Sequence, residues 1–297
     1  MTKKEISHFP FKCILIKKDT TINGNGHSID ASGLSSMFFV GKGTNVTLEN
    51  VVLKNGHIDC SGGNLLGNGG AIVVGVNALL NLKNCTLINN NAQYNGGAIS
   101  LQYKTAKANI DNCSFIGNSA TSHGGAIYSG SGENDVNITN CYFKENSAKR
   151  GGAIYQVSVQ NSTFEKNTAK DTGGAMYCND AYNCYFKENN ANRGGAIFGS
   201  TAIHSTFDRN TAKFGDAIYS GDAINSTFIN VSNKNSLIYS GNYAYSNIEN
   251  CTFNYLNSDN TNDNGNPTPD HSKENNIAQF ADNISTISKR EILDEKL

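Results

Sequence analysis

The feature that most constrains the fold of this 297-residue chain is a sequence motif that recurs along most of its length. Gly-Gly-Ala begins at Gly69, Gly96, Gly124, Gly151, Gly173 and Gly194, and altered copies follow at Gly215 and Asn235. Successive copies are 27, 28, 27, 22, 21, 21 and 20 residues apart. Self-similarity with a period of about 20–50 residues is typical of repeat architectures. We therefore expect one structural unit per copy.

A second motif accompanies the first and carries the pattern of a β-strand. Asn-Cys/Ser-x-Phe, or a close variant, begins at Asn84, Asn112, Asn140, Asn161, Asn183, His204, Asn225 and Asn250. Apolar and polar positions alternate within it, as where Ser162 and Phe164 flank Thr163, and a period of two indicates strands. The consensus Leu positions and the helical segment of a leucine-rich repeat are missing. The pattern therefore predicts an all-β fold, a single-stranded parallel β-helix of about ten coils.

Stacked coils turn equivalent positions into columns. We expect an inward aromatic column that includes Phe115, Phe143, Phe164, Phe186 and Phe207. Three residues after each aromatic residue comes an Asn, for which we expect a left-handed turn conformation and side-chain amides that hydrogen-bond to one another. This column includes Asn118, Asn146, Asn167, Asn189 and Asn210. Cys alternates with Ser in a further inward column, which predicts small buried residues rather than metal ligands.

The two alternating motifs, GGAI and FxxN, resemble the repeats of the polymorphic outer-membrane proteins of chlamydiae. The Asn-rich version, with TINGNGHSIDASG at residues 21–33 ahead of NVTLENVVLKNG at residues 45–56, is more similar to the adhesin-like surface proteins of methanogenic archaea. The resemblance covers about residues 20–255. It implies a right-handed, pectate-lyase-like β-helix located at the cell surface or outside the cell, with adhesion as the usual function.

The ends of the chain carry no repeat. We expect an N-terminal cap over residues 1–20, the β-helix over 21–256, a polar linker over 257–276 and a short amphipathic helix over 277–297. Lys12 and Lys17 interrupt the apolar runs near the basic N-terminus, so we expect no signal peptide in this chain. Either the protein stays inside the cell, or this start is not that of an exported precursor.

Composition and charge argue against two classes of partner. The 24 basic and 25 acidic residues nearly balance, so the chain lacks the excess of positive charge that attracts nucleic acid. No run of apolar residues approaches the length of a transmembrane helix. We therefore expect neither nucleic-acid binding nor a transmembrane segment.

The sequence offers no recognisable catalytic constellation. Polysaccharide lyases and glycoside hydrolases need charged side chains that converge on one substrate bond, but here the charges alternate in sign along two columns. Lys144, Glu165, Lys187 and Asp208 form one column, and Glu145, Lys166, Glu188 and Arg209 form the next. Opposite charges on neighbouring strands predict structural pairing. We therefore expect no catalytic residue, no metal and no cofactor.

One surface column is a candidate for ligand contact. Alternation places a row of aromatic residues outside the β-helix: Tyr128, Tyr155, Tyr177, Phe198, Tyr219 and Tyr239. This aromatic stripe suits sugar faces or a protein partner. Stacking between neighbouring strands is the simpler explanation, because the stripe is present wherever the repeat is present. Basic residues gather near the Gly-Gly bend: Lys149, Arg150, Lys170, Arg193 and Lys213.

The leading hypothesis is a non-enzymatic, adhesin-like surface protein that contacts glycans or proteins of a host or neighbouring cell. Two alternatives remain open at this point. One is a polysaccharide lyase or glycoside hydrolase, and the other is a structural spacer at the cell surface. Convergent carboxylates on one outer face would favour the enzyme, a continuous aromatic stripe over a groove would favour binding, and a fully polar, flat surface would favour the spacer.

Overall fold

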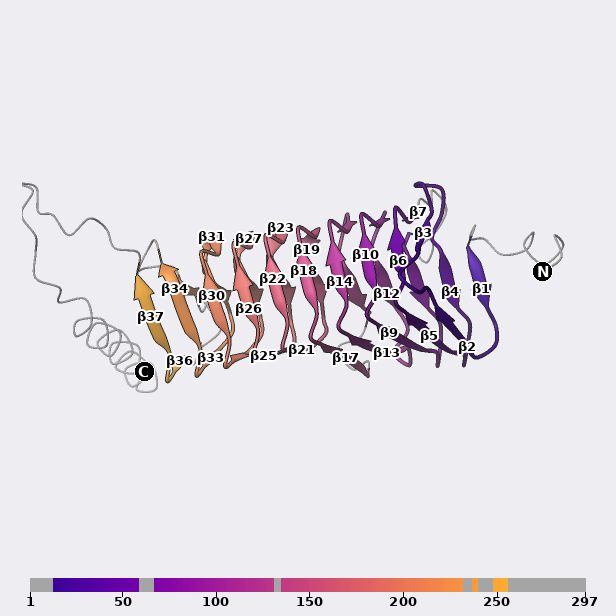
Figure 1. Ribbon diagram of the computed structural model, residues 1–297. Coiled ribbons are helices and arrows are strands. Elements are labelled where there is room, and N and C mark those ends of the chain that lie inside the picture. Colours follow the sequence, from indigo (N-terminus) through magenta and orange to yellow (C-terminus); the bar gives the residue numbers. More distant parts are fainter. Residues whose placement is uncertain (1–12, 59–66, 131–134, 232–236, 240–247, 256–297) are drawn as a thin grey trace, which may run out of the picture.

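The chain winds into a rod in which each coil contributes one short strand to each of three parallel sheets, and most coils contribute one to a fourth (Figure 1). The computed structural model describes residues 13–58, 67–130, 135–231, 237–239 and 248–255. Three sheets contain ten strands each, in agreement with about ten coils, and the fourth contains seven. Every described pairing between strands is parallel, so the predicted parallel β-helix is confirmed.

We call the four sheets A, B, C and D. In each coil the chain passes through sheet B, then C, then D and finally A. Sheet A consists of β1 (Ile14–Ile16), β4 (Phe38–Val40), β8 (Ile72–Val74), β12 (Ile99–Leu101), β16 (Ile127–Ser129), β20 (Ile154–Tyr155), β24 (Met176–Tyr177), β28 (Ile197–Phe198), β32 (Ile218–Tyr219) and β35 (Ile238–Tyr239). Sheet B consists of β2 (Thr20–Asn23), β5 (Asn45–Glu49), β9 (Leu79–Lys83), β13 (Lys107–Asp111), β17 (Val136–Thr139), β21 (Val159–Gln160), β25 (Ala181–Tyr182), β29 (Ala202–Ile203), β33 (Ala223–Ile224) and β36 (Ile248–Glu249).

The second sequence motif forms sheet C, and the segment before each Gly-Gly forms sheet D. Sheet C consists of β3 (Ser28–Asp30), β6 (Val52–Lys54), β10 (Thr86–Ile88), β14 (Ser114–Ile116), β18 (Tyr142–Lys144), β22 (Thr163–Glu165), β26 (Tyr185–Lys187), β30 (Thr206–Asp208), β34 (Thr227–Val231) and β37 (Thr252–Tyr255). Sheet D consists of β7 (His57–Ile58), β11 (Asn91–Ala92), β15 (Ser119–Ala120), β19 (Ser147–Arg150), β23 (Thr168–Thr172), β27 (Asn190–Arg193) and β31 (Thr211–Phe214).

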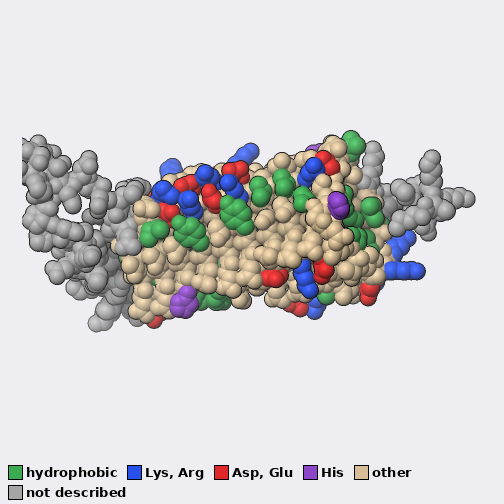
Figure 2. Space-filling model, in the orientation of Figure 1, with side chains coloured by type: hydrophobic (Ala, Val, Ile, Leu, Met, Phe, Trp, Pro, Cys, Tyr) green, Lys and Arg blue, Asp and Glu red, His purple; other side chains and the backbone are tan. Residues whose placement is uncertain are grey.

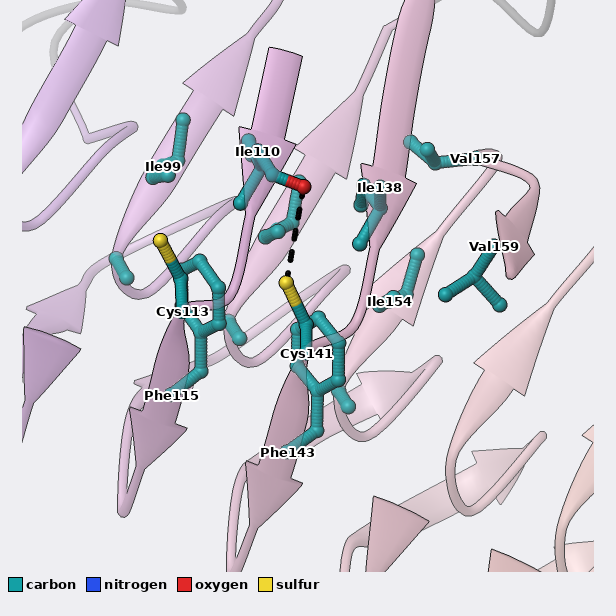
Figure 3. Packing of buried hydrophobic residues seen from close by; sticks show 14 of the residues in the cluster. Ile99, Ile110, Cys113, Phe115, Ile138, Cys141, Phe143, Ile154, Val157 and Val159 are labelled. Atoms are coloured by element: carbon teal, nitrogen blue, oxygen red, sulfur yellow. Dashed lines mark hydrogen bonds between the residues drawn. The ribbon is translucent and has the colours of Figure 1, made fainter. Parts of the chain in front are cut away.

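The core is a set of columns that run parallel to the rod axis. The phenylalanine rings from Phe115 to Phe253 stack with centroid distances of 4.7–5.0 Å and interplanar angles of 6–10°. Cys113 and Cys141 project beside Phe115 and Phe143, where the Sγ of Cys141 donates to the backbone carbonyl of Ile110 at 3.7 Å (Figure 3). The predicted inward aromatic column is confirmed, and its regular spacing follows from the separation of parallel strands.

Buried asparagines form a continuous hydrogen-bonded column. Each Nδ2 donates to Oδ1 of the equivalent Asn in the next coil, at 2.9–3.0 Å, from Asn90 through Asn118, Asn146, Asn167 and Asn189 to Asn210. The predicted stacking of amides is confirmed, but the predicted left-handed conformation of these residues is wrong. That conformation belongs to the preceding residue, with φ of 54° at both Glu145 and Lys166. It directs the Asn side chain into the core, where the amide reaches a backbone carbonyl of the previous coil.

The Gly-Gly pair forms the bend between sheets D and A, and its two residues have different physical roles. Gly151 has a φ of 60°, a left-handed conformation that glycine adopts without cost. Gly152 does not have a positive φ, but a Cβ there would lie 2.0 Å from the carbonyl oxygen of Gly174. A Cβ at Gly151 would itself lie 2.2 Å from the carbonyl oxygen of Ile154. The first glycine is therefore needed both for its conformation and for close contact within its coil, and the second for close contact between successive coils.

The terminal segments are only partly described. Ile14–Ile16 forms β1, the first strand of sheet A, and pairs with β4. Residues 1–12 of the predicted cap lie outside the described residues, as do the linker predicted for 257–276 and the helix predicted for 277–297.

Candidate ligand-binding face

The aromatic stripe lies on the outer side of sheet A, where the chain continues from each buried Ile or Met. Tyr128, Tyr155, Tyr177, Phe198, Tyr219 and Tyr239 pair in register across six consecutive strands. All six side chains are partly exposed. The structure thus brings the six predicted residues into one continuous row.

The rings of the stripe cover one another. Tyr155, Tyr177, Phe198 and Tyr219 stack with centroid distances of 4.7–5.1 Å and interplanar angles of 4–6°. Because each face packs against the next ring, the stripe presents ring edges to solvent over most of its length. Stacking therefore stabilises sheet A, and an approaching ligand meets edges rather than open faces.

Burial keeps the phenol groups protonated. Burial, followed by the neighbouring Tyr177, raises the pKa of Tyr155 to about 12. Burial also raises the pKa of Tyr128 and of Tyr177. These tyrosines are therefore neutral at physiological pH and can both donate and accept hydrogen bonds.

His123 lies beside the Gly-Gly bend and packs against the rings of Tyr128 and Tyr155 at one end of the stripe. The repeated sequence motifs do not include it. Its ring centroid lies 4.4 Å from that of Tyr155, and its Nδ1 lies 2.9 Å from Oδ1 of Asn95. Burial, together with the charges of Arg150 and Lys149, lowers the pKa of His123. Its position directly before a Gly-Gly pair, where Arg150 occupies the next coil, is the signal that identifies it.

The charged columns lie on the edge between sheets C and D, where Lys, Arg, Asp and Glu side chains alternate (Figure 2). In the second column Nζ of Lys166 lies 3.7 Å from Oε2 of Glu188, and Nη2 of Arg209 lies 3.0 Å from Oε1 of Glu188. In the first column Glu165 accepts a hydrogen bond from the hydroxyl group of Tyr142. Pairing between coils thus occurs in the second column, while a tyrosine of the preceding coil contacts the Glu165 carboxylate.

Asp208 is the most buried of these carboxylates. It accepts hydrogen bonds from the Tyr185 hydroxyl at 2.9 Å and from Nδ2 of Asn230 at 2.8 Å, and Nε of Arg209 lies 3.1 Å away. Burial alone would raise its pKa, but these hydrogen bonds and the Arg209 charge outweigh burial and lower it. Asp208 is therefore held as a carboxylate within a structural network.

The geometry described so far is that of a known family. The family model described as right-handed β-helix region matches residues 69–253. The chain belongs to the right-handed β-helix family. The predicted handedness is thereby confirmed, whereas membership defines the fold and leaves the activity open. Comparison with curated proteins finds no significant match.

Within this right-handed β-helix, the described cysteines are all free. Cys and Ser share one column because either side chain can accept a hydrogen bond from the backbone amide of the equivalent residue in the preceding coil. The amide of Cys85 donates to Sγ of Cys113 at 3.4 Å, and that of Cys141 donates to Oγ of Ser162 at 3.0 Å. Among the described residues, no group of three or more His, Cys, Asp or Glu side chains is arranged to hold a metal. None of the described segments forms a helix with the length and apolarity needed to span a membrane.

Proposed function

We propose that this protein is a non-enzymatic, adhesin-like protein of the cell surface, which uses the side of its β-helix to contact glycans or proteins of another cell. The observation that carries the proposal is the aromatic stripe, which continues over six strands of sheet A without interruption. The similarity of the repeats to adhesin-like proteins of methanogenic archaea and to polymorphic outer-membrane proteins supports the same function.

The shape of the stripe favours an extended ligand. Its groups repeat at 4.7–5.5 Å along the rod axis, so a polymer lying along the axis meets the same contact many times. Repeated weak contacts on one ligand add up to useful affinity, because each contact after the first is intramolecular. A compact ligand would use only one or two coils.

The state of the carboxyl groups supports binding without cleavage. A general acid needs a raised pKa, but hydrogen bonds lower the pKa of Asp30, Asp111 and Glu165, through Asn55, Thr139 and Tyr142 respectively. The pKa of Asp208 is lowered as well. The depression between sheets B and C has no ionisable side chain in its lining of Asn25, Gly26, Asn50, Val51, Val52 and Asn84.

The proposal is tested with a glycan array and two double variants of the full chain. Tyr155→Ala with Tyr177→Ala removes two neighbouring rings of the stripe, and we expect binding to fall by about tenfold or more. Tyr142→Ala with Tyr185→Ala is the matched control, because it removes two partly exposed tyrosines from sheet C. Equal losses in both variants, or no binding to any glycan or cell surface by the parent protein, would leave the spacer as the better account.

A further inference from the structure

The outer side of sheet D carries an accumulation of positive charge. Four consecutive strands, β19, β23, β27 and β31, present five cationic side chains that we call the basic face: Lys149, Arg150, Lys170, Arg193 and Lys213. All are exposed except Arg150, which is partly exposed. The acidic residues on these strands and in the bend that follows are Asp171 and Asp216. Positive charge therefore dominates this part of the rod.

Most of the basic face is not neutralised by ion pairs. Among the described residues, Arg150 is paired with Asp171 at 3.6 Å, and no ion pair involves Lys149, Lys170, Arg193 or Lys213. On the adjacent edge between sheets C and D, by contrast, Lys166 and Arg209 are both paired with Glu188. Burial is the largest cause of the lowered pKa of His123, and the charges of Arg150 and Lys149 lower it further.

The opposite side of the rod is acidic from the coil of β21 to the coil of β36, a stretch that overlaps the coils of the basic face. Sheet B lies across the cross-section from sheet D, along the lower edge in Figure 1. Its strands from β21 to β36, with the described residues just before them, contain Asp180, Asp222 and Glu249 and no Lys or Arg. The net charge of −1 therefore conceals a separation of charge across the rod, and it is the local face that a charged partner experiences.

Polar groups accompany the cations. A second outward column on sheet D consists of exposed hydroxyl and amide side chains, namely Ser147, Thr168, Asn190 and Thr211. Nδ2 of Asn190 donates to Oγ1 of Thr211 at 2.7 Å. Cations can pair with carboxylate or sulfate groups, while neighbouring hydroxyl and amide groups can hydrogen-bond to the hydroxyl groups of a sugar.

We infer that the basic face binds an extended acidic polysaccharide, which lies across strands β19 to β31 along the rod axis. This inference rests on the proposed function and names the class of glycan. Four adjacent strands span about 14 Å, enough for several charged sugars. Sequence-tolerant binding of single-stranded nucleic acid uses aromatic faces to stack bases, but the neighbouring aromatic stripe has most of its faces covered.

The experiment measures binding of the full chain to polygalacturonate, heparin, dextran and a single-stranded oligonucleotide. The test variant is Lys149→Glu, Lys170→Glu, Lys213→Glu on sheet D. The control variant is Lys42→Glu, Lys83→Glu, Lys107→Glu, which changes net charge equally at exposed positions on or beside sheet B. We expect the acidic polysaccharides to bind at least about tenfold more tightly than dextran, with affinity falling as salt rises. This preference should be lost in the test variant and retained in the control.

The possible results separate the two proposals. Dextran binding as tight as that of the acidic polymers, with sensitivity to the stripe variant, would overturn the inference and leave the proposed function standing. Equal losses in the two charge variants, or oligonucleotide binding as tight as that of polygalacturonate, would show attraction to polyanions in general and would also overturn it. If none of these polymers binds, the inference is overturned, whereas the proposed function fails only if the parent protein also binds no other glycan and no cell surface.

Discussion

At the scale of the residue, the buried asparagine column is the clearest link between sequence and stability. Asn167 is fully buried and donates to the Phe143 carbonyl at 2.9 Å and to Oδ1 of Asn189 at 3.0 Å. Its own Oδ1 accepts from the backbone and side-chain nitrogens of Asn146 at 3.0 and 2.9 Å. Removal of this amide leaves buried groups without partners, which is more costly than the loss of an exposed hydrogen bond.

We therefore expect Asn167→Ala to lower the free energy of unfolding by about 3 kcal/mol or more. Asn109→Ala is the matched control, because Asn109 also belongs to an amide column, with Nδ2 donating to Asn81 at 2.9 Å, but is exposed on sheet B. Its cost should be below about 0.5 kcal/mol. Chemical denaturation of both variants measures the difference, and similar losses would show that burial does not determine the contribution.

His123 gives a second prediction at this scale. Its pKa is lowered in the folded protein, so the unfolded chain binds a proton more readily as the pH falls through about 6.5. The stability that His123 contributes is present above this pH and is lost as the pH falls toward the folded-state pKa. His123→Gln should therefore show a smaller loss of unfolding free energy between about pH 7 and pH 5. If the unfolding free energy of His123→Gln depended on pH as that of the parent protein does, this role of His123 would be contradicted.

At the scale of the element, two turns show two uses of glycine: Gly152 lies in the bend between sheets D and A, and Gly26 lies in the turn between β2 and β3. We expect Gly152→Ala to destabilise the protein by about 3 kcal/mol or more, because the new Cβ would meet the Gly174 carbonyl oxygen at 2.0 Å. Gly26 has a φ of 81°, and a Cβ added there would have no other atom within 4 Å, so Gly26→Ala should cost only about 1–2 kcal/mol. Thermal unfolding of the two variants compares them, and equal costs would refute the role of close contact.

The sequence predicts the direction of a side chain well where the alternation of a β-strand alone determines it. The inward position of Phe164 follows from alternation about Thr163, and the outward position of Tyr155 from its place after Ile154. Residue type alone favours Asn167 over Lys166 as the left-handed residue of the turn, because Asn adopts that conformation more readily. The actual choice depends on directing the amide into the core, which requires knowledge of both neighbouring coils.

At the scale of the whole molecule, each coil contacts only its neighbours, so stability should vary along the rod. Strands β18 and β22 have several coils on both sides, whereas among the described strands β1 pairs with β4 alone. We expect amide hydrogen exchange to be slowest in the central strands and faster in β1. Uniform protection along the rod would contradict this prediction, because it would indicate that all coils unfold as a single cooperative unit.

The candidate faces are only partly predictable at this scale. The six stripe residues can be identified from the repeat alone, but the mutual covering of their ring faces depends on side-chain orientation. The five residues of the basic face are visible in the sequence as a scattered group. Only the folded rod shows that four of them form no ion pair with another described residue and that an acidic side lies opposite them. Charge balance along the sequence does not reveal charge separation across a cross-section.

The central claim, that the rod binds glycans without cleaving them, is tested most directly by measuring the chain length of a bound polysaccharide. The full protein is incubated with polygalacturonate and with dextran, bound polymer is recovered, and its size is compared with that of untreated polymer by size-exclusion chromatography. The account predicts recovery of bound polymer at unchanged length. Progressive shortening of either polymer would contradict the account and would show that the protein is a polysaccharide-cleaving enzyme.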